Sequence, residues 1–290
     1  MNYTLTNDVM TVKLTSFGAE LTSLTDPKGT EYIWNADERY WKRHTPVLFP
    51  IVGKVRDNEY VIGGKSYKIP AHGFARDYEF EIEKRTDCKI TFALRSSLAT
   101  KAMYPYDFCL KIHYTLVENR LGIEYEVINE DKMPMPFKIG AHPAFNCPRF
   151  SDETMEDYEL VWEKEEESTQ ILINEDVYLT KAYKPFKTSR IPLSKDLFEK
   201  EGVLIWTHYT SQSMSLVSKK HPEKLTVDFK NFPFLGVWSP TNEGAFVCIE
   251  PWQGHADYVD DSLVLQEKSD IILLEAGQSF NCEHGISIFF

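Results

Sequence analysis

The chain has 290 residues and a formal net charge of −12, with 42% hydrophobic, 13% aromatic and 26% charged residues. This composition is typical of a globular protein with enough apolar side chains for a core, and it excludes a disordered chain. The negative balance argues against nucleic acids and anionic membranes as partners, because a polyanion is held by positive charge. A neutral small molecule fits the charge best.

The five cysteines are odd in number and show no CxxC spacing, which disfavours a disulfide framework and a zinc ribbon. Residues 1–6 carry neither the basic nor the apolar region of a secretory signal. No apolar run approaches the roughly 20 residues that cross a bilayer. We therefore expect a cytoplasmic protein with no membrane partner.

Hydrophobic residues recur with a period of two along most of the chain. Every even position of residues 108–116 is apolar, and so is every odd position of residues 121–127, as half-buried antiparallel strands require. Residues 117–120 between them read as a hairpin turn. The same alternation appears at residues 80–82, 90–94, 213–217, 225–229 and 286–289.

Helical patterns are short, and the best one covers residues 194–200, where Ser194 is placed to cap the first turn. The most polar stretch, residues 163–168, is expected to be a solvated loop or a strand end. No repeat and no Gly/Ser-rich or Pro-rich linker divides the chain. We predict one all-β domain over residues 1–290, a large antiparallel sandwich with few short helices.

Most of the eight histidines have an ordinary structural explanation. His113, His221 and His284 are expected at the surface, while His44, His208 and His255 are more often structural than catalytic in such contexts. Two others stand in constrained turns. His72 lies between Pro70 and Gly73, and His142 lies between Gly140 and Pro143, which favours an extended backbone at His142. Such turns aim a side chain into a cleft.

Glu250 follows the apolar run 245–249 and precedes Pro251, so we expect it where a buried strand ends. A carboxylate in that place is costly unless it is paired or functional, and partial desolvation raises its pKa towards the range of a general base. Several aromatic residues of the chain, in part close in sequence to His72, His142 and Glu250, offer faces on which a sugar ring can stack: Phe74, Phe145, Trp238 and Trp252.

Two other enzyme classes fit these residues poorly. A cupin-like metal site needs a close His-x-His pair, and no such pair is present. A glycosidase needs two opposed carboxylates, and only Glu250 has a suitable context. Both classes are therefore disfavoured, and we predict no metal.

Four segments stand out together: Phe49-Pro50-Ile51-Val52-Gly53, His72-Gly73-Phe74-Ala75-Arg76, Gly140-Ala141-His142-Pro143-Ala144-Phe145 and Ile249-Glu250-Pro251-Trp252. In these segments the chain resembles the aldose 1-epimerase, or galactose mutarotase-like, family, and within it the LacX-type subgroup. The resemblance implies a large antiparallel β-supersandwich with an open cleft. It also implies exchange between the α and β anomers of a free aldose, without a cofactor.

The resemblance assigns roles to residues of this chain. Glu250 is the expected general base at the anomeric hydroxyl, and His142 is the expected general acid at the ring oxygen. Further residues are expected to bind the sugar: His72, Arg76, Arg56, Lys54, Glu201 and Trp252. Glu201 departs from the family pattern, because galactose mutarotases carry an aspartate near this place, just ahead of a strand corresponding to residues 203–206.

The resemblance leaves alternatives open. A hexose 6-phosphate is a second possible substrate, with Arg76 helping to hold the phosphate, and a non-catalytic carbohydrate-binding or sugar-sensing protein can use the same scaffold. We expect the protein to be a monomer or a homodimer, with a small-molecule aldose as its partner.

Overall fold

The structure is a computed structural model that describes all residues from 1 to 290. Antiparallel strands dominate it, and only two α-helices are present, which confirms the predicted fold class. None of its helices is both long and apolar enough to cross a bilayer.

The strands are β1 (Asn2–Thr6), β2 (Thr11–Thr15), β3 (Leu21–Thr25), β4 (Val47–Leu48), β5 (Glu59–Ile62), β6 (Lys65–Lys68), β7 (Glu81–Arg85), β8 (Lys89–Arg95), β9 (Phe108–Val117), β10 (Arg120–Asn129), β11 (Met135–Phe137), β12 (Ile139–Ala141), β13 (Ala144–Asn146), β14 (Tyr158–Ile173), β15 (Leu179–Pro192), β16 (Leu204–Thr207), β17 (Ser213–Ser218), β18 (Lys224–Asp228), β19 (Phe234–Trp238), β20 (Phe246–Gln253), β21 (Ile272–Leu274) and β22 (Ser279–Phe289). The α-helices are α1 (Leu98–Met103) and α2 (Lys195–Glu201). Short 3-10 turns cover Arg56–Asn58, Ala75–Asp77, Met155–Asp157 and Leu265–Glu267.

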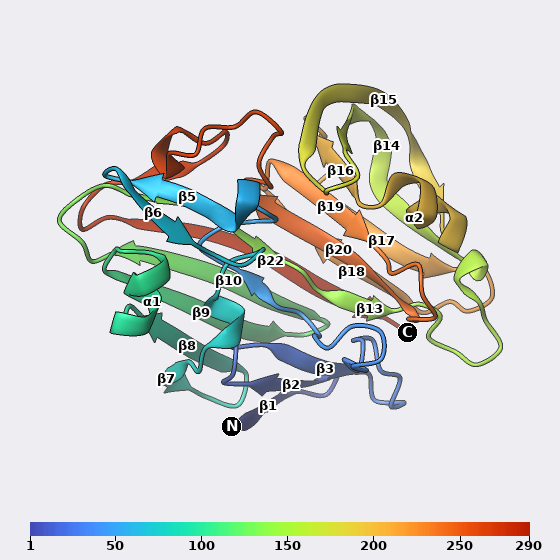
Figure 1. Ribbon diagram of the computed structural model, residues 1–290. Coiled ribbons are helices and arrows are strands. Elements are labelled where there is room, and N and C mark those ends of the chain that lie inside the picture. The colour runs from blue at the N-terminus through green and yellow to red at the C-terminus, as the bar shows by residue number, and fades with distance from the viewer.

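One 15-stranded sheet forms the body of the molecule. Its order is β4-β12-β20-β19-β16-β14-β17-β18-β22-β10-β9-β8-β7, with β13 added beside β20 and β15 beside β14. Figure 1 shows this sheet running through the whole molecule, with the long β14–β15 hairpin curling away at one end. The β1–β3 sheet lies near β7–β9, where Tyr3 packs edge-on against Phe92 at 5.7 Å.

The core is a continuous cluster of 61 buried residues that reaches from the β1–β3 sheet to the far strands of the large sheet. It is built from the alternating apolar positions that the sequence shows. In β9 and β10 the two apolar sets meet across the hairpin, with Leu116 opposite Leu121 and Ile112 opposite Tyr125. The predicted hairpin and both of its strands are confirmed.

Helix α2 also follows the prediction. The side chain of Ser194 accepts a hydrogen bond from the backbone N–H of Leu197 at 3.2 Å, which satisfies one of the free donors at the helix start. Phe198 fills the buried face of the helix.

Three local predictions were wrong, on residues 163–168, on His284 and on Glu250. Residues 163–168 lie in the middle of β14, and not in a loop or at a strand end. The register of β14 shifts between Val161 and Glu166, and the fully buried Glu166 carboxylate accepts the backbone N–H groups of Thr210 and Ser211. His284 is buried rather than exposed, because its ring stacks on Tyr125.

Glu250 was also misplaced by the sequence reading, because it lies in the middle of β20 and not at its end. Pro251 has no backbone N–H to donate, but the strand continues through it because β20 lacks a regular partner strand at this position. On that side β12 pairs with Trp252 and Gln253, and β13 pairs with the strand only up to Cys248. The gap between β12 and β13 is His142-Pro143, so the same irregularity admits the proline and places His142 over Glu250.

Candidate active site

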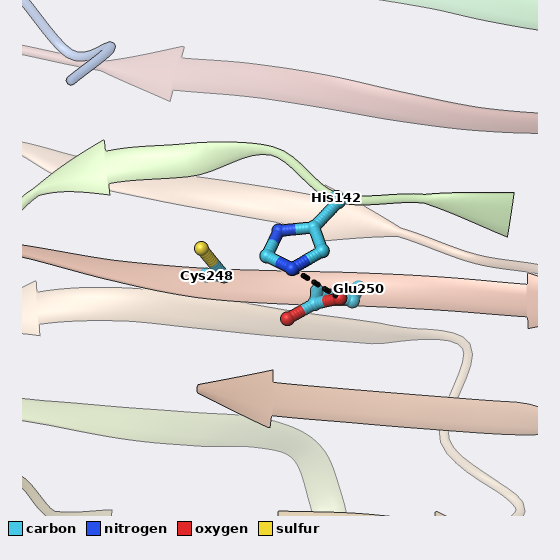
Figure 2. A group of neighbouring side chains, drawn as sticks. All are labelled: His142, Cys248 and Glu250. Atoms are coloured by element: carbon cyan, nitrogen blue, oxygen red, sulfur yellow. Dashed lines mark ion pairs between the residues drawn. The ribbon is translucent and has the colours of Figure 1, made fainter. Parts of the chain in front are cut away.

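His142 and Glu250 meet in a cavity of about 360 Å³. The His142 Nε2 and Glu250 Oε2 atoms lie 3.3 Å apart, which is an ion-pair distance. The two residues are only 7% and 1% exposed, and Oε2 has no hydrogen-bond partner within the protein. Figure 2 shows the imidazole pointing from the β12–β13 gap onto the carboxylate of β20. The pair therefore has polar atoms available to an entering molecule.

Burial opposes a charge on either member of this pair. Desolvation raises the pKa of the Glu250 carboxyl well above its usual range. Desolvation lowers the pKa of His142 to about 3, and the positive Arg76 acts in the same direction. Between these limits the two groups together hold one proton, which either atom can carry.

His72 enters the same cavity from the tight turn that its Pro and Gly neighbours predict. The N–H of Gly73 donates to the carbonyl of Pro70 at 3.0 Å, and His72 itself has a left-handed φ of +66°. Its Nδ1 accepts the backbone N–H of Gly53 at 3.1 Å, so a neutral ring carries its proton on Nε2. Desolvation lowers the pKa of His72 well below its usual range, so the ring is a neutral hydrogen-bond donor.

Three tryptophans form the apolar walls of the cavity. Trp41 stacks on the His142 ring with centroids 5.0 Å apart and planes 28° apart, and Trp238 meets the same ring edge-on at 5.9 Å. The indole of Trp252 lies against two glycines of neighbouring strands. A Cβ on Gly140 would come within 2.7 Å of it, and one on Gly236 within 2.5 Å. These two glycines thus make room for a flat aromatic wall beside Glu250.

The other predicted sugar-binding residues differ in their placement. Lys54 lines the cavity, and its Nζ donates to the backbone carbonyl of Asp176 at 3.1 Å. Arg76 lies behind the wall, since its Nη2 donates to the carbonyl of Ala71 at 2.7 Å, next to His72. Arg56 is not among the residues that line the cavity.

Glu201 lies outside the cavity as well. Its carboxylate accepts hydrogen bonds from Gln170 at 2.8 Å and from Lys184 at 3.1 Å, which fixes it on the α2 side of β14. The cavity therefore brings together His72, His142, Glu250, Lys54 and Trp252, while Arg76, Arg56 and Glu201 stay outside its lining.

The sequence reading missed two residues close to the pair. Trp41 lies in an irregular polar segment with no motif to single it out. Cys248 lies two positions before Glu250 on β20, and strand alternation alone would have placed both on one face. The ligand atoms of His142, Cys248 and Glu250 all lie within 4.8 Å of one another, and Figure 2 shows the three side chains as neighbours.

Comparisons with known proteins agree with this arrangement. A family model described as aldose 1-epimerase matches residues 1–286. The plasmid-encoded protein LacX of Lactococcus lactis subsp. lactis is 34% identical over 288 residues, covering 93% of this chain and 94% of the relative. A solved galactose mutarotase related enzyme from Lactobacillus acidophilus is 33% identical, with a TM-score of 0.96, covering 100% of this chain and 98% of the other.

A galactose mutarotase-like protein from Lactobacillus casei ATCC 334 is 30% identical, and each chain covers 100% of the other with a TM-score of 0.93. The similarity thus spans the whole fold, including the β12–β20 region that carries the cavity. The chain belongs to the aldose 1-epimerase family, an epimerase-type enzyme family, and LacX proteins are among its relatives.

Proposed function

We propose that this protein is an aldose 1-epimerase that interconverts the α and β anomers of a free hexose by acid/base ring opening and closure. The observation that carries the proposal is the desolvated contact of 3.3 Å between His142 Nε2 and Glu250 Oε2, at the wall of the cavity. An acid and a base held this close can serve two oxygens of one sugar ring.

Ring opening needs one proton removed from the anomeric hydroxyl and one proton added to the ring oxygen. In the proposed reaction Glu250, as carboxylate, takes the first proton, and His142, as imidazolium, gives the second. The C1–O5 bond breaks and an aldehyde forms. After rotation about C1–C2, neutral His142 takes the proton back from O5, protonated Glu250 returns one to O1, and the ring closes as the other anomer.

The shared proton explains how the pair serves both halves of this cycle. The ion pair performs ring opening, and the fully neutral pair performs ring closure, so each half-reaction leaves the pair ready for the other. The raised pKa of Glu250 and the lowered pKa of His142 favour the neutral pair, because burial destabilises the ion pair that water would favour, so ring opening starts from the less populated form. Each group contributes about 10²–10⁴-fold to the rate.

Three residues of the lining are proposed to bind the sugar. The Nε2–H of His72 donates to an oxygen of the ring or of a neighbouring hydroxyl, Lys54 binds a distal hydroxyl, and Trp252 packs against the apolar CH face. Arg76 acts indirectly, since it braces the His72 turn through Ala71 and adds positive charge near His142.

The proposed reaction uses only side chains, and the whole of residues 1–290 is proposed to act as one domain. We further propose that the enzyme works on free sugars in the cytoplasm, where cysteines such as the five free ones of this chain stay reduced.

The test is to follow freshly dissolved α-glucose and α-galactose, and their 6-phosphates, to anomeric equilibrium by polarimetry. The proposal expects the wild-type protein to accelerate the exchange and His142→Ala to lose most of the acceleration. A sugar-binding protein without activity would bind the sugar in calorimetry and leave the exchange at the buffer rate. That outcome, for all these sugars, overturns the proposed function.

A further inference from the structure

A third potential metal ligand lies directly beside the proton-transfer pair. Cys248 and Glu250 are two residues apart on β20, so their side chains point to the same face of the sheet. His142 reaches this face from the β12–β13 gap, and Figure 2 shows the three side chains as neighbours. All three residues are buried, and their ligand atoms lie within 4.8 Å of one another.

The spacing of these atoms is close to that of a tetrahedral zinc site. Zn–N and Zn–O bonds of about 2.0–2.2 Å and Zn–S bonds of about 2.3 Å place neighbouring ligand atoms about 3.3–3.6 Å apart. The His142 Nε2 to Glu250 Oε2 distance is already 3.3 Å. Since no two ligand atoms are more than 4.8 Å apart, the Cys248 sulfur needs to approach by about 1.2 Å at most to reach ideal spacing.

The ligand atoms are free to accept a cation. Glu250 Oε2 has no hydrogen-bond partner in the protein, so a metal there replaces only its 3.3 Å contact with His142. Nitrogen, sulfur and oxygen from His, Cys and Glu are the donors that Zn²⁺ takes in proteins, and the sulfur disfavours Mg²⁺ and Ca²⁺. His142 and Glu250 line the cavity, which leaves a fourth ligand position facing it.

Charge balance favours the metal in spite of the burial. When neutral His142, the carboxylate of Glu250 and the thiolate of Cys248 bind Zn²⁺, their two negative charges balance the two positive charges of the metal. The surrounding His72, Arg76 and Arg43, together with Lys54 in the lining, therefore meet no additional positive charge.

We propose that His142, Cys248 and Glu250 form an inhibitory binding site for a thiophilic divalent cation such as Zn²⁺. The metal and the sugar compete for the same imidazole and carboxylate. The inhibition rests on the proposed epimerase function, whereas the binding of the metal does not depend on it.

The binding is tested with Co²⁺ as a coloured substitute for Zn²⁺, added to the intact protein under a thiol-free reductant. We expect a thiolate-to-cobalt charge-transfer band that Zn²⁺ bleaches. The band should persist in Cys109→Ser, which changes another fully buried cysteine on β9, and disappear in Cys248→Ser. A band that survives Cys248→Ser, or no band in the wild-type protein, overturns the site.

A second measurement needs no variant. Calorimetry in buffers of different ionisation enthalpy should show at least one proton released for each Zn²⁺ bound, because a cysteine binds zinc as the thiolate, and the affinity should rise with pH. Binding of Zn²⁺ without proton release overturns the proposed ligand set.

The inhibition is measured by polarimetry. Zn²⁺ should slow anomer exchange reversibly, with EDTA restoring the rate and a higher sugar concentration weakening the effect. Cys248→Ser should keep its activity and lose at least about tenfold in sensitivity to Zn²⁺. Equal sensitivity of the two proteins contradicts the proposal. If the wild-type protein has no epimerase activity, both the proposed function and the inhibitory role of the metal are overturned. The cobalt band then tests metal binding separately.

Discussion

The imidazole of His142 lies with its face against the indole of Trp41, with ring centroids 5.0 Å apart and planes 28° apart. The contact fixes the plane of the imidazole, so that Nε2 points at Glu250. An aromatic face also stabilises an adjacent cation, which here is the imidazolium form that ring opening needs. Trp41 is held in turn, because the indole N–H of Trp34 donates to its backbone carbonyl at 2.9 Å.

Replacing Trp41 should therefore slow the reaction more than it weakens sugar binding. We expect Trp41→Leu to lower kcat about tenfold, since a desolvated cation–π contact contributes about 1–2 kcal/mol. Trp41→Phe keeps an aromatic face and should retain more activity. Initial rates at several sugar concentrations separate kcat from KM. Equal loss in both variants would show that the indole acts only by filling space.

The pair itself gives a prediction about additivity. Glu250→Gln and His142→Gln should each reduce kcat by about 10²–10⁴-fold with little change in KM, because each removes one end of the proton transfer. The kcat of the double variant should be little lower than that of the less active single variant, since neither group transfers a proton usefully alone. Anomer exchange measured by saturation-transfer NMR checks this. Two fully additive losses would mean that the groups act in separate steps.

The pH dependence follows from the opposite pKa shifts of the two groups. When the pH falls below about 3, the pKa of His142, the pair takes up a second proton. When the pH rises above the raised pKa of Glu250, the pair loses its only proton. The rate should therefore hold over a broad plateau and fall at both extremes. Buffer-subtracted rates across the range in which the protein stays folded test this. A narrow maximum would assign independent, nearly unshifted pKa values to the two groups.

Sequence patterns predicted the architecture well, because alternation is a local property of each strand. They also found the three motifs that meet at the cavity, since glycine and proline mark irregular backbone. They placed Glu250 at a strand end because Pro251 usually stops pairing, and only the β12–β13 gap beside it shows why the strand continues. Trp41 is brought to His142 by tertiary packing alone, so no local pattern could reveal it.

Glu201 illustrates the same limit for substrate specificity. Its place just before residues 203–206 suggested a contact with sugar hydroxyls, yet the carboxylate is bound by Gln170 and Lys184 outside the cavity. We expect Glu201→Gln to leave KM for a free hexose unchanged. Lys54→Met should raise KM, about tenfold or more if the substrate carries a phosphate, because a charge-assisted hydrogen bond is lost. A larger effect of Glu201→Gln than of Lys54→Met would contradict this arrangement.

The buried His284 gives a prediction for stability. Burial lowers its pKa to about 4, whereas an unfolded histidine titrates near about 6.5. As the pH falls through this window the unfolded chain takes up the proton first, so folding loses about 2 kcal/mol between about pH 7 and about pH 5 from this group. Urea unfolding at both pH values should show a smaller loss for His284→Leu and His284→Gln than for the wild type. An unchanged pH dependence in both variants would mean that other groups control acid stability.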